Sequence, residues 1–182
     1  EVYLVAGPWH EYADTFDDVE ALVFLREDDP ALAARYLEAT GRYLELYEGM
    51  LTDYPYASFA LVENFWETGY GMPGFTLLGP RIIRFPWILT SSYPHELLHN
   101  WWGNSVYVDY DSGNWCEGLT AYGADHLFAE QRGEGALHRR TTLKKYTDFV
   151  TSGDDFPLTG FTSRRSAATD RRTTGMMSSP SR

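Results

Sequence analysis

The part of the sequence that most strongly constrains the fold is HELLHNWWGN, residues 95 to 104, followed after a short polar segment by NWCEGLTAY, residues 114 to 122. His95 and His99 are four residues apart, so in a helix both imidazoles project from one face and can bind one metal ion. Glu96 lies beside them, where its carboxylate can take a proton from water at an open coordination position. The first stretch therefore predicts a helix that carries two zinc ligands and a general base.

A third ligand is expected on a second helix, because a catalytic zinc site uses three protein ligands and leaves one position open. Glu117, in the second stretch, is the candidate. Glu117 also follows Asn114 by three residues, which fits a capping box instead. In the plainest interpretation the two histidines are ordinary helix residues and Glu96 is a surface charge. The metal site is favoured because it gives both histidines a third partner.

The two stretches together resemble the M1 family of zinc aminopeptidases. That family has HExxH, then Trp and Gly-Asn, then Asn-Glu-Gly before a helix that contains an aromatic residue, and the match here covers about residues 59 to 122. The resemblance implies that His95, His99 and Glu117 bind one Zn²⁺ per chain. It also implies that Glu96 is the general base in the hydrolysis of a peptide bond.

A second, shorter resemblance lies upstream, where residues 60 to 64 read ALVEN. They look like a degraded version of the family's Gly-Ala-Met-Glu-Asn motif, whose glutamate binds the free amino terminus of the substrate. The resemblance implies this role for Glu63, and with it an aminopeptidase whose partner is a peptide with a free N-terminus. The residues themselves leave another interpretation open, in which Glu63 is a structural carboxylate at the end of a strand.

The chain departs from the family's pattern in two places. The segment between His99 and Glu117 is one residue shorter, and the deletion is expected in a loop around residues 109 to 113. The family also places a tyrosine well downstream to hydrogen-bond the tetrahedral intermediate, whereas the last tyrosine here, Tyr146, is too near Glu117. After about Thr169 the sequence looks truncated or shifted out of frame. The alternative function is therefore a non-catalytic zinc-binding fragment that lacks this oxyanion stabilisation.

The resemblance and the pattern of elements predict an α+β, thermolysin-like catalytic domain. A sheet-rich lobe, residues 1–88, is expected before a helical lobe, residues 89–163, with the zinc between them, and residues 164–182 are expected to form a disordered tail. Residues 69–74 fit either a substrate-side loop or a connecting turn. Strands are expected at residues 2–6, 21–25, 57–63 and 75–78. Helices are expected from Pro30 to before Tyr54-Pro55, at 91–102, at 114–132 with Gly123 as a weak point, and at 136–150.

Composition narrows the possible partners. The chain has 182 residues, of which 43% are hydrophobic and 23% charged, as in a globular domain with a real core. The net charge of -11 argues against nucleic acid or an anionic membrane surface as a partner, because either needs clustered Lys and Arg. The negative net charge suits a cationic ligand. No apolar run approaches the roughly 20 residues that span a bilayer, and nothing in the sequence assigns a compartment or an oligomeric state.

The remaining chemically active residues have structural interpretations. Cys116 is the only cysteine, so no intrachain disulfide is expected. It is interpreted as a small buried residue rather than a fourth ligand, because a closed four-ligand site would block the water. The tryptophans near the motif, Trp101, Trp102 and Trp115, are expected in the core around the metal helices. The other histidines are expected at the surface or with polar partners: His10, His126 and His138.

Overall fold

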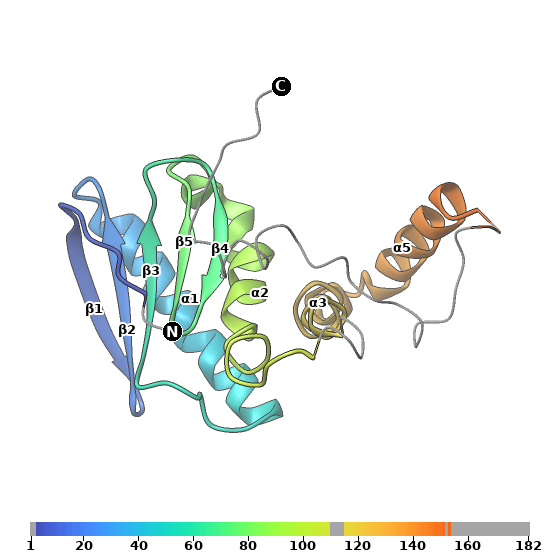
Figure 1. Cartoon of the computed structure of the whole chain (residues 1–182), viewed down its shortest axis with the longest axis horizontal. Helices are drawn as coiled ribbons and strands as arrows, with labels where there is room; N and C mark the ends of the chain where they lie inside the picture. Colours follow the sequence, from blue (N-terminus) through green and yellow to red (C-terminus); the bar gives the residue numbers. More distant parts are fainter. Residues whose placement is uncertain (1–2, 110–114, 152, 154–182) are drawn as a thin grey trace.

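The computed structural model describes residues 3–109, 115–151 and 153, so Asn114 and the predicted tail at 164–182 lie outside the described residues. Five strands form a mixed sheet, with helix α1 between β2 and β3 along the chain, and the other helices follow the last strand (Figure 1). The last helices extend away from the sheet, so the fold is of the α+β kind that the sequence predicts.

The sheet has the strand order β1-β2-β3-β5-β4. The β1-β2 and β4-β5 pairs are antiparallel, whereas β2-β3 and β3-β5 are parallel. Strand β4 is therefore an edge strand that pairs with β5 on one side. The bounds of the five strands are His10–Phe16, Val19–Leu25, Ser58–Glu63, Gly69–Met72 and Phe75–Leu78.

The structure confirms the three central strands and corrects both edges of the sheet. The expected strand at residues 2–6 is not formed, since residues 3–6 are irregular. Strands β1 and β4 were not predicted. The first is polar and mostly exposed, and the second is half glycine, so neither shows the alternation of a half-buried strand. Each becomes a strand by pairing with a more apolar neighbour, which is a tertiary effect that local sequence does not show.

Helix α1, Pro30–Met50, crosses one face of the sheet and supplies much of the core (Figure 1). It begins as predicted, with the Asp29 side chain accepting a hydrogen bond from the Leu32 backbone N–H at 2.9 Å. Its buried tyrosines donate to backbone carbonyls of later segments; Tyr36, for example, donates to the Ile83 oxygen at 2.8 Å. These hydroxyl contacts explain part of the high aromatic content, because Tyr can fill a core and still use its polar end.

The second half of the described chain is helical. Helix α2 is shorter than the predicted 91–102 helix, because Asn100 and Trp101 make tighter backbone hydrogen bonds to Leu97 and Leu98, and Gly103 has a φ of +95°. The predicted 114–132 helix is a continuous run of α3, a π-helical turn η3 and α4. Among the described residues, no helix is long and apolar enough to cross a membrane. The bounds are Ile82–Arg84 (η1), Pro86–Thr90 (η2), Ser92–Leu98 (α2), Cys116–Ala121 (α3), Tyr122–His126 (η3), Leu127–Gln131 (α4) and Gly135–Phe149 (α5).

The three tryptophans near the motif differ in burial. Trp101 is buried, and Trp102 packs half-buried against the core while its indole N–H donates to Thr120 Oγ1 at 2.8 Å. Trp115 is 36% exposed, so the expectation that it lies in the core is wrong. It lies directly before the first residue of α3.

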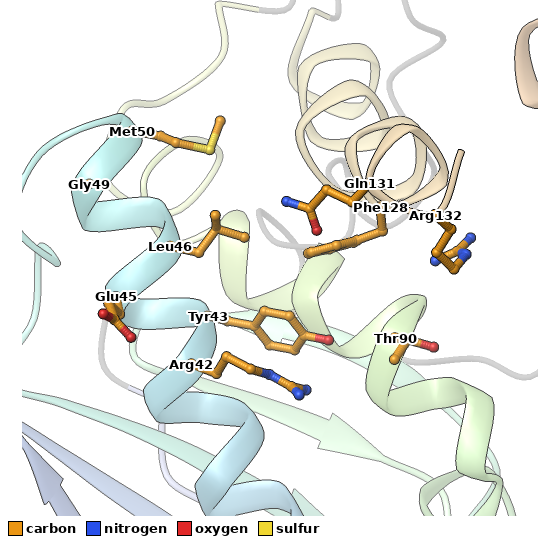
Figure 2. A pocket seen from close by; sticks show the side chains of 10 residues that line it. All are labelled: Arg42, Tyr43, Glu45, Leu46, Gly49, Met50, Thr90, Phe128, Gln131 and Arg132. Atoms are coloured by element: carbon orange, nitrogen blue, oxygen red, sulfur yellow. The ribbon is translucent and has the colours of Figure 1, made fainter. Parts of the chain in front are cut away.

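A groove of about 740 Å³ opens between α1, η2 and α4 (Figure 2). Tyr43, Leu46 and Phe128 form its apolar floor, and Arg42 and Arg132 lie at its rim. None of the predicted site residues lines it, so the groove is separate from the histidine helix.

Truncation of a core side chain on the central strand tests the packing. Leu61 is fully buried on β3, and Leu61→Ala is expected to lower the free energy of unfolding by about 2–5 kcal/mol. Leu137→Ala on α5 is the matched control, because Leu137 is 53% exposed and its loss is expected to change stability by less than about 0.5 kcal/mol. Denaturant unfolding followed by circular dichroism measures both, and equal losses would contradict this description of the core.

Candidate metal centre

Helix α2 has a buried face and an open face. Leu97 and Leu98 are 0% and 1% exposed and anchor the helix in the core. His95, Glu96 and His99 are half-buried on the other face, where they line a pocket of about 720 Å³. The apolar residues between the two histidines therefore fix the direction in which the polar residues point.

Three side chains meet in this pocket with the spacing of a metal centre. His95 Nε2 and His99 Nε2 are 3.2 Å apart, and each is 3.4 Å from a carboxylate oxygen of Glu117. In a tetrahedral zinc site with bonds of about 2.0–2.2 Å, neighbouring ligand atoms are about 3.3–3.6 Å apart. The structure thus brings the three predicted ligands together at distances that suit Zn²⁺, and the Glu117 carboxylate faces the histidines.

The other ring nitrogens of the histidines also have partners. His95 Nδ1 lies 3.7 Å from Asp125 Oδ2. His99 Nδ1 lies 3.3 Å from Thr120 Oγ1, and that hydroxyl donates to the Cys116 carbonyl at 2.9 Å. When the hydroxyl donates to this carbonyl it can accept from His99, an arrangement compatible with the tautomer that carries its proton on Nδ1 and leaves Nε2 free to bind a metal.

Sequence reasoning missed both of these partners. Asp125 and Thr120 belong to the same helical run as Glu117, but each meets a histidine of α2 across the interface between the helices. Only the tertiary arrangement shows this pairing. The buried Cys116 Sγ lies 3.4 Å from His99 Nδ1, on the side of the ring away from Nε2, so it is placed as a packing residue and not with the ligand atoms.

The charges of the site are strongly coupled. Burial lowers the pKa of His95, but hydrogen bonds to the Asp125 and Glu117 carboxylates outweigh burial and raise it to about 9. Burial likewise opposes the hydrogen bonds of His99 to Cys116 and Glu117, which raise its pKa to about 10. Hydrogen bonds from the two histidines lower the pKa of Glu117. The pocket therefore favours positive charge between these three side chains, whether from protons or from a metal ion that displaces them.

Glu96 lies between α2 and the edge strand β4. Burial raises the pKa of its carboxyl group, which suits a residue that must take up and return a proton. Strand β4 passes so close that a Cβ atom on Gly71 would lie 2.7 Å from Glu96 Oε2. Glycine at position 71 therefore lets the backbone of the edge strand line the pocket directly beside the predicted base.

Glu63 is not brought to this pocket. It is 2% exposed at the end of β3, where its Oε1 accepts a hydrogen bond from Arg84 Nη1 at 2.5 Å and its Oε2 accepts the Arg26 backbone N–H at 2.8 Å. Strand β5 separates β3 from the edge strand β4. These contacts join the ends of β2 and β3 to η1, which is the structural interpretation that the sequence left open.

The three remaining histidines are placed as expected. His10 is exposed on the edge strand β1, and His126 and His138 are half-buried with their rings in contact. His126 Nε2 is also 3.3 Å from Glu130 Oε1 and 2.9 Å from Arg139 Nη1. The adjacent arginine makes this cluster unsuited to a cation.

Comparison with known proteins gives a likeness in structure alone. No profile of a known protein family matches the chain, and no curated protein matches it. A mutant M1 zinc metallopeptidase from Deinococcus radiodurans, bound to a Tyr-Ser-Ala substrate, superimposes with a TM-score of 0.61 and 18% identity, over 85% of this chain and 35% of that protein. Native yeast LTA4 hydrolase gives 0.56 and 15%, over 76% of this chain and 22% of that protein. The chain has the fold of these metallopeptidases and spans about a third of their length or less.

The ligand set can be tested by metal content. We expect about one zinc per chain in the purified protein and little or none in His99→Ala, because two ligands hold Zn²⁺ much more weakly than three. His10→Ala is the matched control, since it removes an exposed imidazole far from the cluster in sequence. Elemental analysis after gel filtration measures all three proteins. Equal zinc in the wild type and His99→Ala would show that the metal, if bound, is held elsewhere.

Proposed function

We propose that this chain carries the catalytic centre of a zinc-dependent metallopeptidase. The observation that supports this most strongly is the meeting of three features in one pocket: the triad His95, His99 and Glu117 at ligand distances, Glu96 beside it, and the backbone of an edge strand. The fold shared with M1 zinc metallopeptidases agrees with it. The structures compared are much longer than this chain, so the activity of the whole protein is part of the proposal.

Each residue has a role in the proposed reaction. Zinc, held by the two histidines and Glu117, would supply positive charge that polarises the scissile carbonyl. Glu96 accepts a proton from the attacking water and returns it to the leaving amine, and its raised pKa assists this exchange. Thr120 holds the His99 ring in the tautomer that presents Nε2.

The edge strand is the basis for proposing a peptide as the substrate. Within the described part of the chain, β4 pairs with β5 only, and residues 69–73 line the pocket. An edge strand can hydrogen-bond an extended peptide through its backbone, whatever the side chains of that peptide are. The loop-or-turn prediction for residues 69–74 therefore becomes a more specific proposal, in which β4 is a substrate-side strand.

Selectivity for a free amino terminus is not assigned to Glu63. The prediction of an aminopeptidase needs a carboxylate that faces the substrate ammonium, and the Glu63 carboxylate contacts Arg84 and the Arg26 backbone instead. We propose that Glu63 stabilises the sheet. In this proposal Glu63 does not bind the substrate ammonium group, and it does not determine how far from the N-terminus the peptide is cleaved.

The alternative is a zinc-binding domain without catalysis. Tyr146, the last tyrosine, lies on α5 and does not line the pocket, although Tyr3, Tyr70 and Tyr107 do. An assay on zinc-loaded protein with aminoacyl-coumarin and internally quenched peptides separates the two functions. Turnover that a chelator abolishes supports the peptidase, whereas stoichiometric zinc without turnover supports the alternative.

Glu96→Gln tests the general base. The amide keeps the size of the side chain and loses the basicity, so we expect unchanged zinc content and a loss of about 100-fold or more in kcat. Glu11→Gln on β1 is a control for the lost charge, because Glu11 is exposed on the opposite edge of the sheet. Retained turnover in Glu96→Gln would remove Glu96 from the mechanism.

Glu63→Gln tests the structural role of Glu63. The substitution removes the carboxylate that pairs with Arg84, so we expect a loss of about 1–3 kcal/mol in the free energy of unfolding. The loss is expected at the lower end of this range if the Arg84 side chain turns to solvent. The ratio of kcat/KM for free and acetylated amino-terminal peptides is expected to stay within about 2-fold of wild type. A loss of about 100-fold confined to the free-amine peptide would instead give Glu63 the ammonium-binding role.

A further inference from the structure

The π-helical turn η3 is held unusually close to α2. A Cβ atom on Gly123 would lie 2.8 Å from Leu98 Cδ2, so a larger residue here would require the end of the Leu98 side chain to shift. The buried hydroxyl of Tyr47, on α1, lies 3.4 Å from the Gly123 carbonyl oxygen and 3.5 Å from the Pro94 carbonyl oxygen. One tyrosine thus faces both helical segments at the point where they meet.

The π-helical turn also changes which residue faces the metal ligands. Asp125 follows Glu117 by eight residues, and in an uninterrupted α-helix it would point about 80° away from Glu117. A π-helical turn accommodates about one extra residue, so the effective separation becomes about seven residues, which places both side chains on one face. Both carboxylates can therefore reach the same histidine.

The two carboxylates contact opposite sides of the His95 ring. Glu117 Oε2 lies 3.4 Å from Nε2, and Asp125 Oδ2 lies 3.7 Å from Nδ1, a distance typical of an ion pair. His99 Nε2, at 3.2 Å, is also on the Nε2 side. His95 therefore has its metal-facing nitrogen and its supporting nitrogen in separate surroundings.

We propose that Asp125 is a positioning residue for the metal centre. Its carboxylate lies at ion-pair distance from His95 Nδ1, 3.7 Å, and favours the ring orientation and the tautomer that presents Nε2 to Zn²⁺. The inference rests on the proposed zinc centre and extends it. His95 faces a charged carboxylate at 3.7 Å, whereas His99 faces the neutral hydroxyl of Thr120 at 3.3 Å, so the loss of Asp125 removes a charged support from one of the two imidazole ligands.

Zinc affinity of the full chain tests this directly. We expect Asp125→Ala to raise the zinc Kd by about 10–100-fold in competition with a fluorescent chelator, and Asp125→Asn, which keeps the size, to raise it less. Asp148→Asn is the matched control: it removes one carboxylate charge at an exposed position on α5, and we expect a change below about 2-fold. Asp125 is 39% exposed, so its replacement should leave the circular dichroism spectrum unchanged.

A spectroscopic measurement separates positioning from loss of charge. The visible absorption of the Co²⁺-substituted protein reports the coordination geometry, and we expect it to change in Asp125→Ala and to recover partly in Asp125→Glu. Wild-type affinity and an unaltered spectrum in Asp125→Ala would overturn the role of Asp125 while leaving the zinc centre intact. Failure of the wild-type chain to bind zinc would overturn the centre itself, and this inference with it.

Discussion

The proposed metal centre depends on the close approach of two helical segments. Helix α2 and its C-cap residue His99 supply two imidazoles, and the run from Cys116 to Gln131 supplies the carboxylate of Glu117. Two glycines lie where the segments meet: a Cβ atom on Gly103 would lie 2.9 Å from Cys116 Sγ, and one on Gly123 would lie 2.8 Å from Leu98 Cδ2. A side chain at either position would require these neighbouring atoms to shift, close to a ligand triangle whose edges are 3.2–3.4 Å.

The sheet contributes to the site through its edge. Strand β4 brings backbone, and at Gly71 only backbone, against the carboxyl group of Glu96. The interior strand β3 contributes to the stability of the fold. Its residues Leu61 and Phe59 are fully buried, and Glu63 at its end forms an ion pair with Arg84. The proposed chemistry thus lies at β4, which is an edge strand among the described residues, and the ion pair of Glu63 with the partly exposed Arg84 joins the end of β3 to η1.

The sequence was sufficient for the features whose signal is local. His95, Glu96 and His99 follow from helical spacing, and α1 from its cap and its apolar periodicity. Glu117 needed the chemical argument that zinc requires a third ligand. The edge strand β4 could not be predicted, because its glycines indicate a turn unless the partner strand is known.

Two individual residues show the limit of local sequence for the same physical reason. Glu63 was assigned from a short match and its role in binding a substrate stays a prediction, whereas the backbone topology, which places β5 and β4 between it and the edge of the sheet, supports the structural role proposed for it. Asp125 was missed because a regular helix would turn it away from Glu117, and the π-helical turn that brings it back has no signal in the sequence beyond the weak point at Gly123.

X-ray absorption at the zinc edge of the zinc-loaded chain tests the central claim most directly. The account predicts a first shell of nitrogen and oxygen only, at about 2.0–2.2 Å, with the outer-shell scattering of two imidazoles, because His95, His99 and Glu117 hold the ion. It predicts no sulfur, since Cys116 faces Nδ1 of His99 and not its metal-binding nitrogen. A sulfur scatterer near about 2.3 Å, or fewer than two imidazoles, would contradict it.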